Sequence, residues 1–300
     1  MPIYEAAYRE WERGAGTGRG SPTLAIASVM ATRVLRLRFV KLILLIVIPC
    51  ACFFSFVVFY ASYGEILARI RARSGVSDFN MLHLVNQQFL LPARPFAVLL
   101  AAIVGTPLIA EDRRARALPL YFSRPITHVH FVVGKFLTVA FFLSLLMLLP
   151  PLCFYIVEVM LSPQSGVASA QLPSLLRSFV PGLVMVAILS SLSLGVSALF
   201  RRPTYASLAF LGTISFSWAG AQALSASLRD PAWFAIAPTS VVVSIASDVV
   251  PLPPEVAGLV DVVHGRLRLE PGLAWLGAAA WVAGGLALLS WRVRNVEVVT

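Results

Sequence analysis

The sequence predicts an all-α integral membrane protein, and three observations support this. Hydrophobic residues make up 58% of the 300 residues and charged residues only 13%, whereas a soluble domain carries about 25% charged residues. Several stretches approach the roughly 20 apolar residues that a membrane-spanning helix needs, and basic residues gather between alternate stretches. We therefore expect the chain to lie in a lipid bilayer. It should have six transmembrane helices, at about 39–61, 93–111, 131–157, 176–200, 204–226 and 273–291.

The N-terminal part divides into a tail and a helix. Residues 1–20 are expected to form a flexible cytoplasmic tail because glycine recurs in "RGAGTGRGSP", and residues 21–300 to form a single transmembrane domain. Ser21 and Pro22 are typical of an N-cap and a first-turn proline. The helix that they open is predicted to be amphipathic and to lie along the inner membrane surface; a continuous extension of the first span is the alternative.

The distribution of basic residues predicts the orientation. With both termini inside, 16 of the 24 Lys and Arg residues fall in cytoplasmic segments, although the external loops are longer in total. Short basic loops stay in the cytoplasm, so we expect a multi-pass protein of the cell inner (plasma) membrane with both termini cytoplasmic. The arginines are scattered among loops and form no single patch, which argues against nucleic acid as a partner.

The segment 231–247 could change this count, because it is apolar and uncharged for 17 residues. Pro238 and the dense Ser and Thr content favour a short external helix, re-entrant or interfacial, placed before the sixth span. The sixth span itself is bracketed by Trp275 and Trp291. Their separation of about 24 Å along a helix is typical of two interfacial aromatic belts.

The chain lacks a recognisable source of chemical energy or catalysis. The predicted helix interiors hold no ionisable residue that could bind a coupling ion. The sequence has no nucleotide-binding loop, since "VVGKF" has Phe136 where the Ser or Thr hydroxyl belongs. Asp248, Asp261 and His264 lie in one predicted external loop and are interpreted as solvated. We expect no catalytic residue, no metal site and no cofactor in this chain, and therefore no enzyme.

The segment 109–135, "IAEDRRARALPLYFSRPITHVHFVVGK", separates the second and third spans. Placed on a helix, residues 112–130 carry one apolar stripe with arginines on the remaining faces. Pro125 ends or kinks that helix, because the residue before a proline avoids helical geometry. We expect a short, stiff elbow that tilts two spanning helices together when force is applied to it.

This segment resembles the first cytoplasmic loop of the type-2 permeases of ATP-binding-cassette exporters. The matching positions are Ile109, Ala110, Glu111, Arg113, Leu118, Ser123, Pro125, Ile126, Gly134 and Lys135. The sequence departs from the family pattern at Arg116–Ala117 and at His128. Six spans, an N-terminal surface helix and an external excursion before the last span also fit the family.

The resemblance implies that the loop is a coupling helix that docks on a cytoplasmic ATP-binding-cassette ATPase subunit. ATP and Mg are then expected on that partner, and a second permease, identical or homologous, is expected to enclose the path. The docking residues implied are Glu111, Arg113, Arg116, Phe122, Ser123, Arg124, Pro125, Ile126, Gly134 and Lys135.

The leading interpretation is thus the permease subunit of an ATP-driven exporter. The apolar spans favour an amphipathic or hydrophobic cargo. Hydroxyl residues on the fourth and fifth spans, such as Ser190 and Ser197, are assigned to helix packing before cargo contact. Two alternatives stay open: a non-transporting scaffold or sensory subunit worked by an ATPase, and a membrane enzyme that processes lipids.

Overall fold

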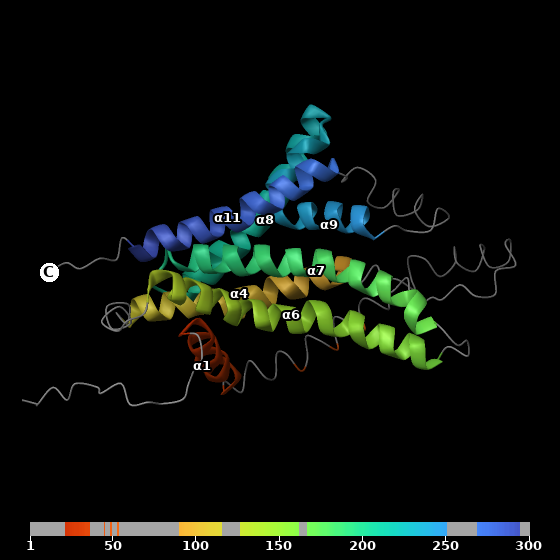
Figure 1. The fold of residues 1–300 in the computed structure, drawn as a ribbon. Coiled ribbons are helices and arrows are strands. Elements are labelled where there is room, and N and C mark those ends of the chain that lie inside the picture. Colours follow the sequence, from red (N-terminus) through yellow and green to blue (C-terminus); the bar gives the residue numbers. More distant parts are fainter. Residues whose placement is uncertain are drawn as a thin grey trace, which may run out of the picture.

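The computed structural model places a bundle of long helices with a short helix across it (Figure 1). The residues that it describes are 22–36, 90–115, 127–161, 167–250 and 269–294, together with Leu45, Pro49 and Phe53. Every regular element within these ranges is helical. The predicted tail 1–20 and first span 39–61 lie outside them, apart from those three isolated positions.

The long helices correspond to the predicted second to sixth spans. They are α4 (Leu90–Arg114), α6 (His128–Leu161), α7 (Val167–Ser197), α8 (Pro203–Leu228) and α11 (Pro271–Arg294). Within the described residues, length and composition suit four of them to crossing a membrane, namely α4, α6, α7 and α11.

Most observed helices run past the predicted bounds, whereas α7 starts nine residues before the predicted 176 and ends at Ser197, three residues before the predicted 200. The prediction placed Arg177 at the end of the span, but Arg177 is exposed on the surface of α7 and does not interrupt the helix. α6 is 34 residues long, or about 51 Å, and so exceeds the roughly 30 Å hydrocarbon core.

The separate helix predicted over 112–130 is wrong at both ends. Asp112 to Arg114 complete α4, and His128 to His130 open α6. The connection between the two long helices is therefore confined to residues 115–127, of which 116–126 lie outside the described part. The described ends of this predicted elbow thus belong to α4 and α6.

α7 is the centre of the bundle and packs against α4, α6, α8, α9 and α11. Where α7 crosses α11, a Cβ on Gly195 would lie 2.7 Å from Gly285 O, and one on Gly285 would lie 2.6 Å from the backbone carbon of Ser191. Such distances are far inside van der Waals contact, so only glycine admits the two backbones here. Small residues serve this purpose where membrane helices pack closely.

The segment 231–247 forms two short elements, η1 (Pro231–Ile236) and α9 (Pro238–Val249). α9 has 12 residues, or about 18 Å, too short to span the hydrocarbon core. Residues 238–245 are all buried, with α9 packed against α7 and α11. The prediction of a short helix is confirmed, and the structure buries it within the bundle.

The helix α1 (Pro22–Arg36) confirms the helix predicted after Pro22. It lies across α6 with Met30 and Val34 buried, while Leu24 and Val29 face outward (Figure 1). Its expected position along the inner membrane surface stays a prediction.

Candidate functional site

The described residues of the predicted docking segment lie at one end of the bundle, where α1, α4 and α6 meet. Glu111 and Arg113 are on the last turn of α4, and Gly134 and Lys135 are in the second turn of α6. We call this meeting point the three-helix junction. The remaining predicted docking residues lie outside the described ranges, namely Arg116, Phe122, Ser123, Arg124, Pro125 and Ile126.

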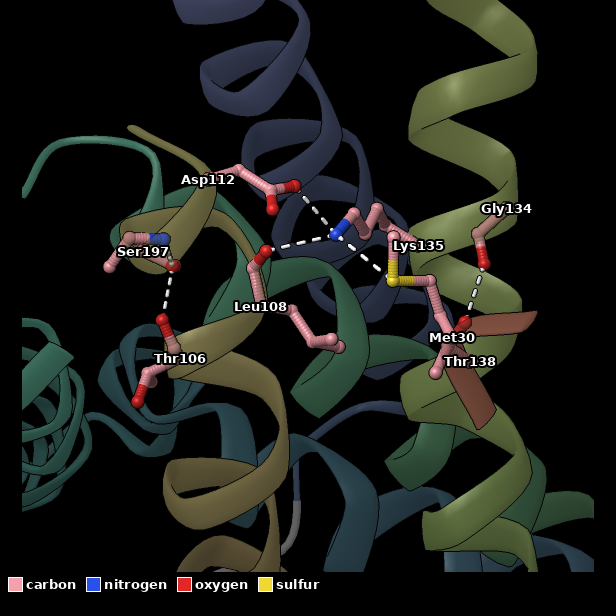
Figure 2. Close-up of polar contacts among 9 residues, drawn as sticks. Met30, Thr106, Leu108, Asp112, Gly134, Lys135, Thr138 and Ser197 are labelled. Carbon is pink, nitrogen blue, oxygen red and sulfur yellow. Dashed lines mark hydrogen bonds and ion pairs between the residues drawn. The ribbon is translucent and has the colours of Figure 1, made fainter. Parts of the chain in front are cut away.

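Lys135 is the centre of the junction (Figure 2). Its Nζ lies 2.7 Å from Asp112 Oδ2, and the two side chains are only 1% and 7% exposed. The same ammonium donates to Leu108 O at 3.0 Å and lies 5.5 Å from the centroid of the Phe131 ring. Met30 Sδ, 3.6 Å away, adds a contact from α1. One cation thus connects α4, α6 and α1.

Among the described residues, the buried Asp112 Oδ2 depends on the Lys135 ammonium alone. Asp112 Oδ2 is buried and makes no hydrogen bond there apart from its contact with the Lys135 ammonium. Removing one member of a buried pair leaves the other charge without compensation, which costs about 3–5 kcal/mol. The pair therefore holds the end of α4 against the start of α6.

Gly134 explains why α1 comes so close. A Cβ at this position would lie 2.8 Å from Ile26 Cγ2 and 3.3 Å from the backbone oxygen of Thr23. α1 therefore rests directly on the α6 backbone, and Thr138 Oγ1 donates to Gly134 O at 2.9 Å on the same helix. The neighbouring Gly134 and Lys135 have distinct tasks: the glycine admits α1, and the lysine connects it to α4.

The exposed end of α4 carries the charges that point outward. Arg113 is half-buried and donates from its guanidinium to Ala198 O, just past the end of α7. A cation at a helix C-terminus compensates the partial negative charge of the last carbonyls. Glu111 and Arg114 are exposed and are available to a partner at the start of the 115–127 connection.

The hydroxyls of α7 are used within the bundle. Ser197 Oγ donates to Thr106 O and accepts from the backbone N–H of Ala110 at 3.1 Å. Thr106 Oγ1 in turn lies 2.6 Å from Ser207 Oγ of α8. Ser190 is fully buried as well. Ser197 therefore serves helix packing, whereas the buried Ser190 Oγ has no hydrogen-bond partner among the described residues.

Comparison with known families identifies the chain's relatives. A sequence model described as "ABC-2 family transporter protein" matches residues 30–227, which is about two thirds of the 300 residues. The chain belongs to the ABC-2 transporter family. Among curated proteins, no sequence matches it.

Membership makes this ABC-2 protein a multi-pass membrane permease, of a family whose members generally work with an ATP-binding-cassette ATPase. The matched region includes Met30, Asp112 and Lys135, and so covers the junction and the connection between α4 and α6. It ends before η1, so the buried α9 lies outside it.

Sequence reasoning missed Asp112 and Met30, and it was wrong to treat the spans as free of buried charge. Asp112 stands 23 positions before Lys135, on the other side of a connection, so no local periodicity links them. One signal was present: Lys135 is one of only two lysines in the chain, the other being Lys41, and it lies inside a predicted span. A lone lysine there needs a counter-ion.

Proposed function

We propose that this ABC-2 permease is the transmembrane subunit of an ATP-driven exporter in the plasma membrane, with both termini in the cytoplasm. A separate ATP-binding-cassette ATPase binds ATP and Mg and docks on the segment from Glu111 to Ile126. A second permease, identical or homologous, completes the path. The family match carries the transport assignment, and the geometry of the junction supports the docking segment.

The supporting observation is that both ends of the 115–127 connection are held together. Asp112 ends α4 and Lys135 lies in the second turn of α6, and their ion pair joins the two helices just beyond the connection. A push on the connection is then shared by α4 and α6 instead of bending one of them. Coupling of this kind needs a rigid element with two discrete arrangements, which packed helices provide.

The cargo assignment follows from what the bundle presents. Ser197 of α7 is used in helix packing, and the outward faces of α6, α8 and α11 are apolar, with exposed side chains such as Phe141, Phe216 and Leu276. If a second permease packs against such faces, or if cargo enters along them, an amphipathic or hydrophobic cargo fits better than a small ion.

The test is reconstitution with the partner. The full chain is purified from its native host, its co-eluting proteins are assayed for ATP hydrolysis, and the complex is placed in liposomes loaded with an amphipathic fluorescent dye. We expect ATP hydrolysis in the eluate and ATP-dependent dye movement. Arg124→Glu with Pro125→Ala should abolish dye movement while ATP hydrolysis and membrane insertion persist.

A matched control is available on α7, where Arg177→Glu with Pro173→Ala makes the same chemical changes at exposed positions far from the connection. This control should move dye as the unaltered chain does. Dye movement without any ATP-hydrolysing companion, or an equal loss in both double variants, would contradict the proposal.

A further inference from the structure

Arginines that are scattered in the sequence, and that were expected to form no single patch, converge from three elements at the end of the bundle that carries the junction. Arg113 and Arg114 end α4, Arg201 and Arg202 form the turn between α7 and α8, and Arg292 lies near the end of α11 (Figure 1). Arg113 is close enough to Arg201 and Arg292 to be repelled by both. Among the described residues at this end, the carboxylates are Glu111 and Asp112, and Asp112 is already paired with Lys135. The cluster is therefore strongly positive.

The structure holds these like charges together. Arg113 is fixed by its hydrogen bond to Ala198 O, beside the turn that bears Arg201. Arg292 Nε is buried and, within the described ranges, has no hydrogen-bond partner, while its guanidinium carbon lies 5.9 Å from the ring of Trp291. A buried donor of a charged group without a partner is costly. An anion that accepts from Arg292 would remove this cost and the repulsion together.

The residues around the cluster favour an anion that belongs to a lipid. Val293 and Arg114 end two of the segments suited to crossing a membrane, so the cluster lies at the edge of the apolar zone. Exposed apolar and aromatic side chains adjoin it, including Tyr205 at 54%, Trp291 at 55% and Leu208 at 61%. Aromatic residues of this kind mark the headgroup level of a bilayer.

We propose that Arg201 and Arg292, with Arg113 behind them, bind the phosphate of an anionic phospholipid in the inner leaflet. The guanidinium group matches phosphate oxygens with two parallel N–H donors. The Trp291 and Tyr205 rings flank the headgroup, and Arg202, whose guanidinium carbon is 5.8 Å from the Tyr205 ring, adds positive charge. The site joins α4, α11 and the α7–α8 turn; its place in the inner leaflet rests on the cytoplasmic termini of the proposed function, and it does not depend on the ATPase assignment.

The test uses the full chain in neutral detergent, with phosphatidylglycerol, phosphatidylcholine and inorganic phosphate as probes. Retained lipid is counted by native mass spectrometry, and apparent affinity is taken from the lipid-dependent rise in melting temperature. We expect phosphatidylglycerol to bind, phosphatidylcholine to have little effect, and Arg201→Gln with Arg292→Gln to weaken the affinity for phosphatidylglycerol about thirtyfold.

The control is Arg177→Gln with Arg229→Asn, which removes two exposed charges at the opposite end of α7 and α8; Asn suits Arg229 because that residue has φ 53°. This control should bind phosphatidylglycerol as the unaltered chain does. Should the first pair fail to fold, Arg201→Lys with Arg292→Lys keeps both charges and should retain binding that weakens as salt rises.

Three results would overturn the assignment. One is equal phosphatidylglycerol binding by all variants, and another is saturation by inorganic phosphate without lipid binding. The third is a glutamine pair that keeps its lipid but loses a co-purifying protein, because the cluster would then be a protein contact.

Discussion

The ion pair between Lys135 and Asp112 makes the sharpest prediction about stability. Lys135→Met keeps the length of the side chain but removes the ammonium, and so leaves the Asp112 carboxylate buried and unpaired. The contacts at Leu108 O and Met30 Sδ are lost with it. From the burial of both side chains, we expect a loss of about 3–5 kcal/mol, or a fall in melting temperature on the order of 10 °C.

The double variant separates pairing from packing. Lys135→Met with Asp112→Asn removes both charges, so no uncompensated ion stays buried, and we expect it to be more stable than Lys135→Met alone. The assay is thermal unfolding of the full chain in detergent for the two single variants and the double. Arg114→Met serves as the control because it deletes an exposed cation on the last turn of α4, and it should change stability by less than about 0.5 kcal/mol.

Additive losses in this cycle would refute the reasoning. If Lys135→Met and Asp112→Asn each cost several kcal/mol and the double variant costs their sum, the two residues act independently. If Lys135→Met is as mild as Arg114→Met, the ammonium does not hold the junction.

Two further predictions concern the bundle and its topology. Gly285→Ala places a Cβ 2.6 Å from the backbone of α7 and should cost about 2 kcal/mol of stability. The control is the neighbouring Gly284→Ala, whose Cβ meets nothing within 4 Å, and it should be neutral or stabilising by up to about 1 kcal/mol. Equal melting temperatures for the two variants would contradict the crossing of α7 and α11. If α9 does not span, Ser227→Cys and Glu270→Cys, at exposed positions before η1 and before α11, should react with a membrane-impermeant maleimide from the same side of sealed vesicles. Labelling from opposite sides would mean that the segment between them crosses the membrane.

The agreement between sequence and structure is best where a single physical cause acts alone. Length and uniform hydrophobicity are enough to require a helix in lipid, since each backbone polar group must be satisfied within its own segment. That is why α4, α6, α7, α8 and α11 all appear where apolar runs predicted them. For the segment 231–247, Pro238 and the dense Ser and Thr content favoured a short helix over a spanning one.

The predicted helix bounds were less accurate because charged residues were taken to mark helix ends. A helix does not end at a charged residue when that residue faces outward, as Arg177 does, or when it finds a buried partner, as Asp112 does. For these reasons α7 starts nine residues before its predicted span, and α4 ends three residues after its predicted span. The segment that resembles a family loop lies between α4 and α6, and most of it lies outside the described residues, so its docking role stays a prediction.

The sequence alone determined that this chain is a helical membrane protein with a basic connection between two spans, because composition and periodicity are local properties. Which residues of distant helices meet was decided by packing in three dimensions. The contact of Lys135 with Asp112 and Met30, the crossing of Gly195 on Gly285 and the gathering of Arg113, Arg201 and Arg292 join positions far apart in the chain. No local pattern encodes such pairs, since they follow from how the helices cross.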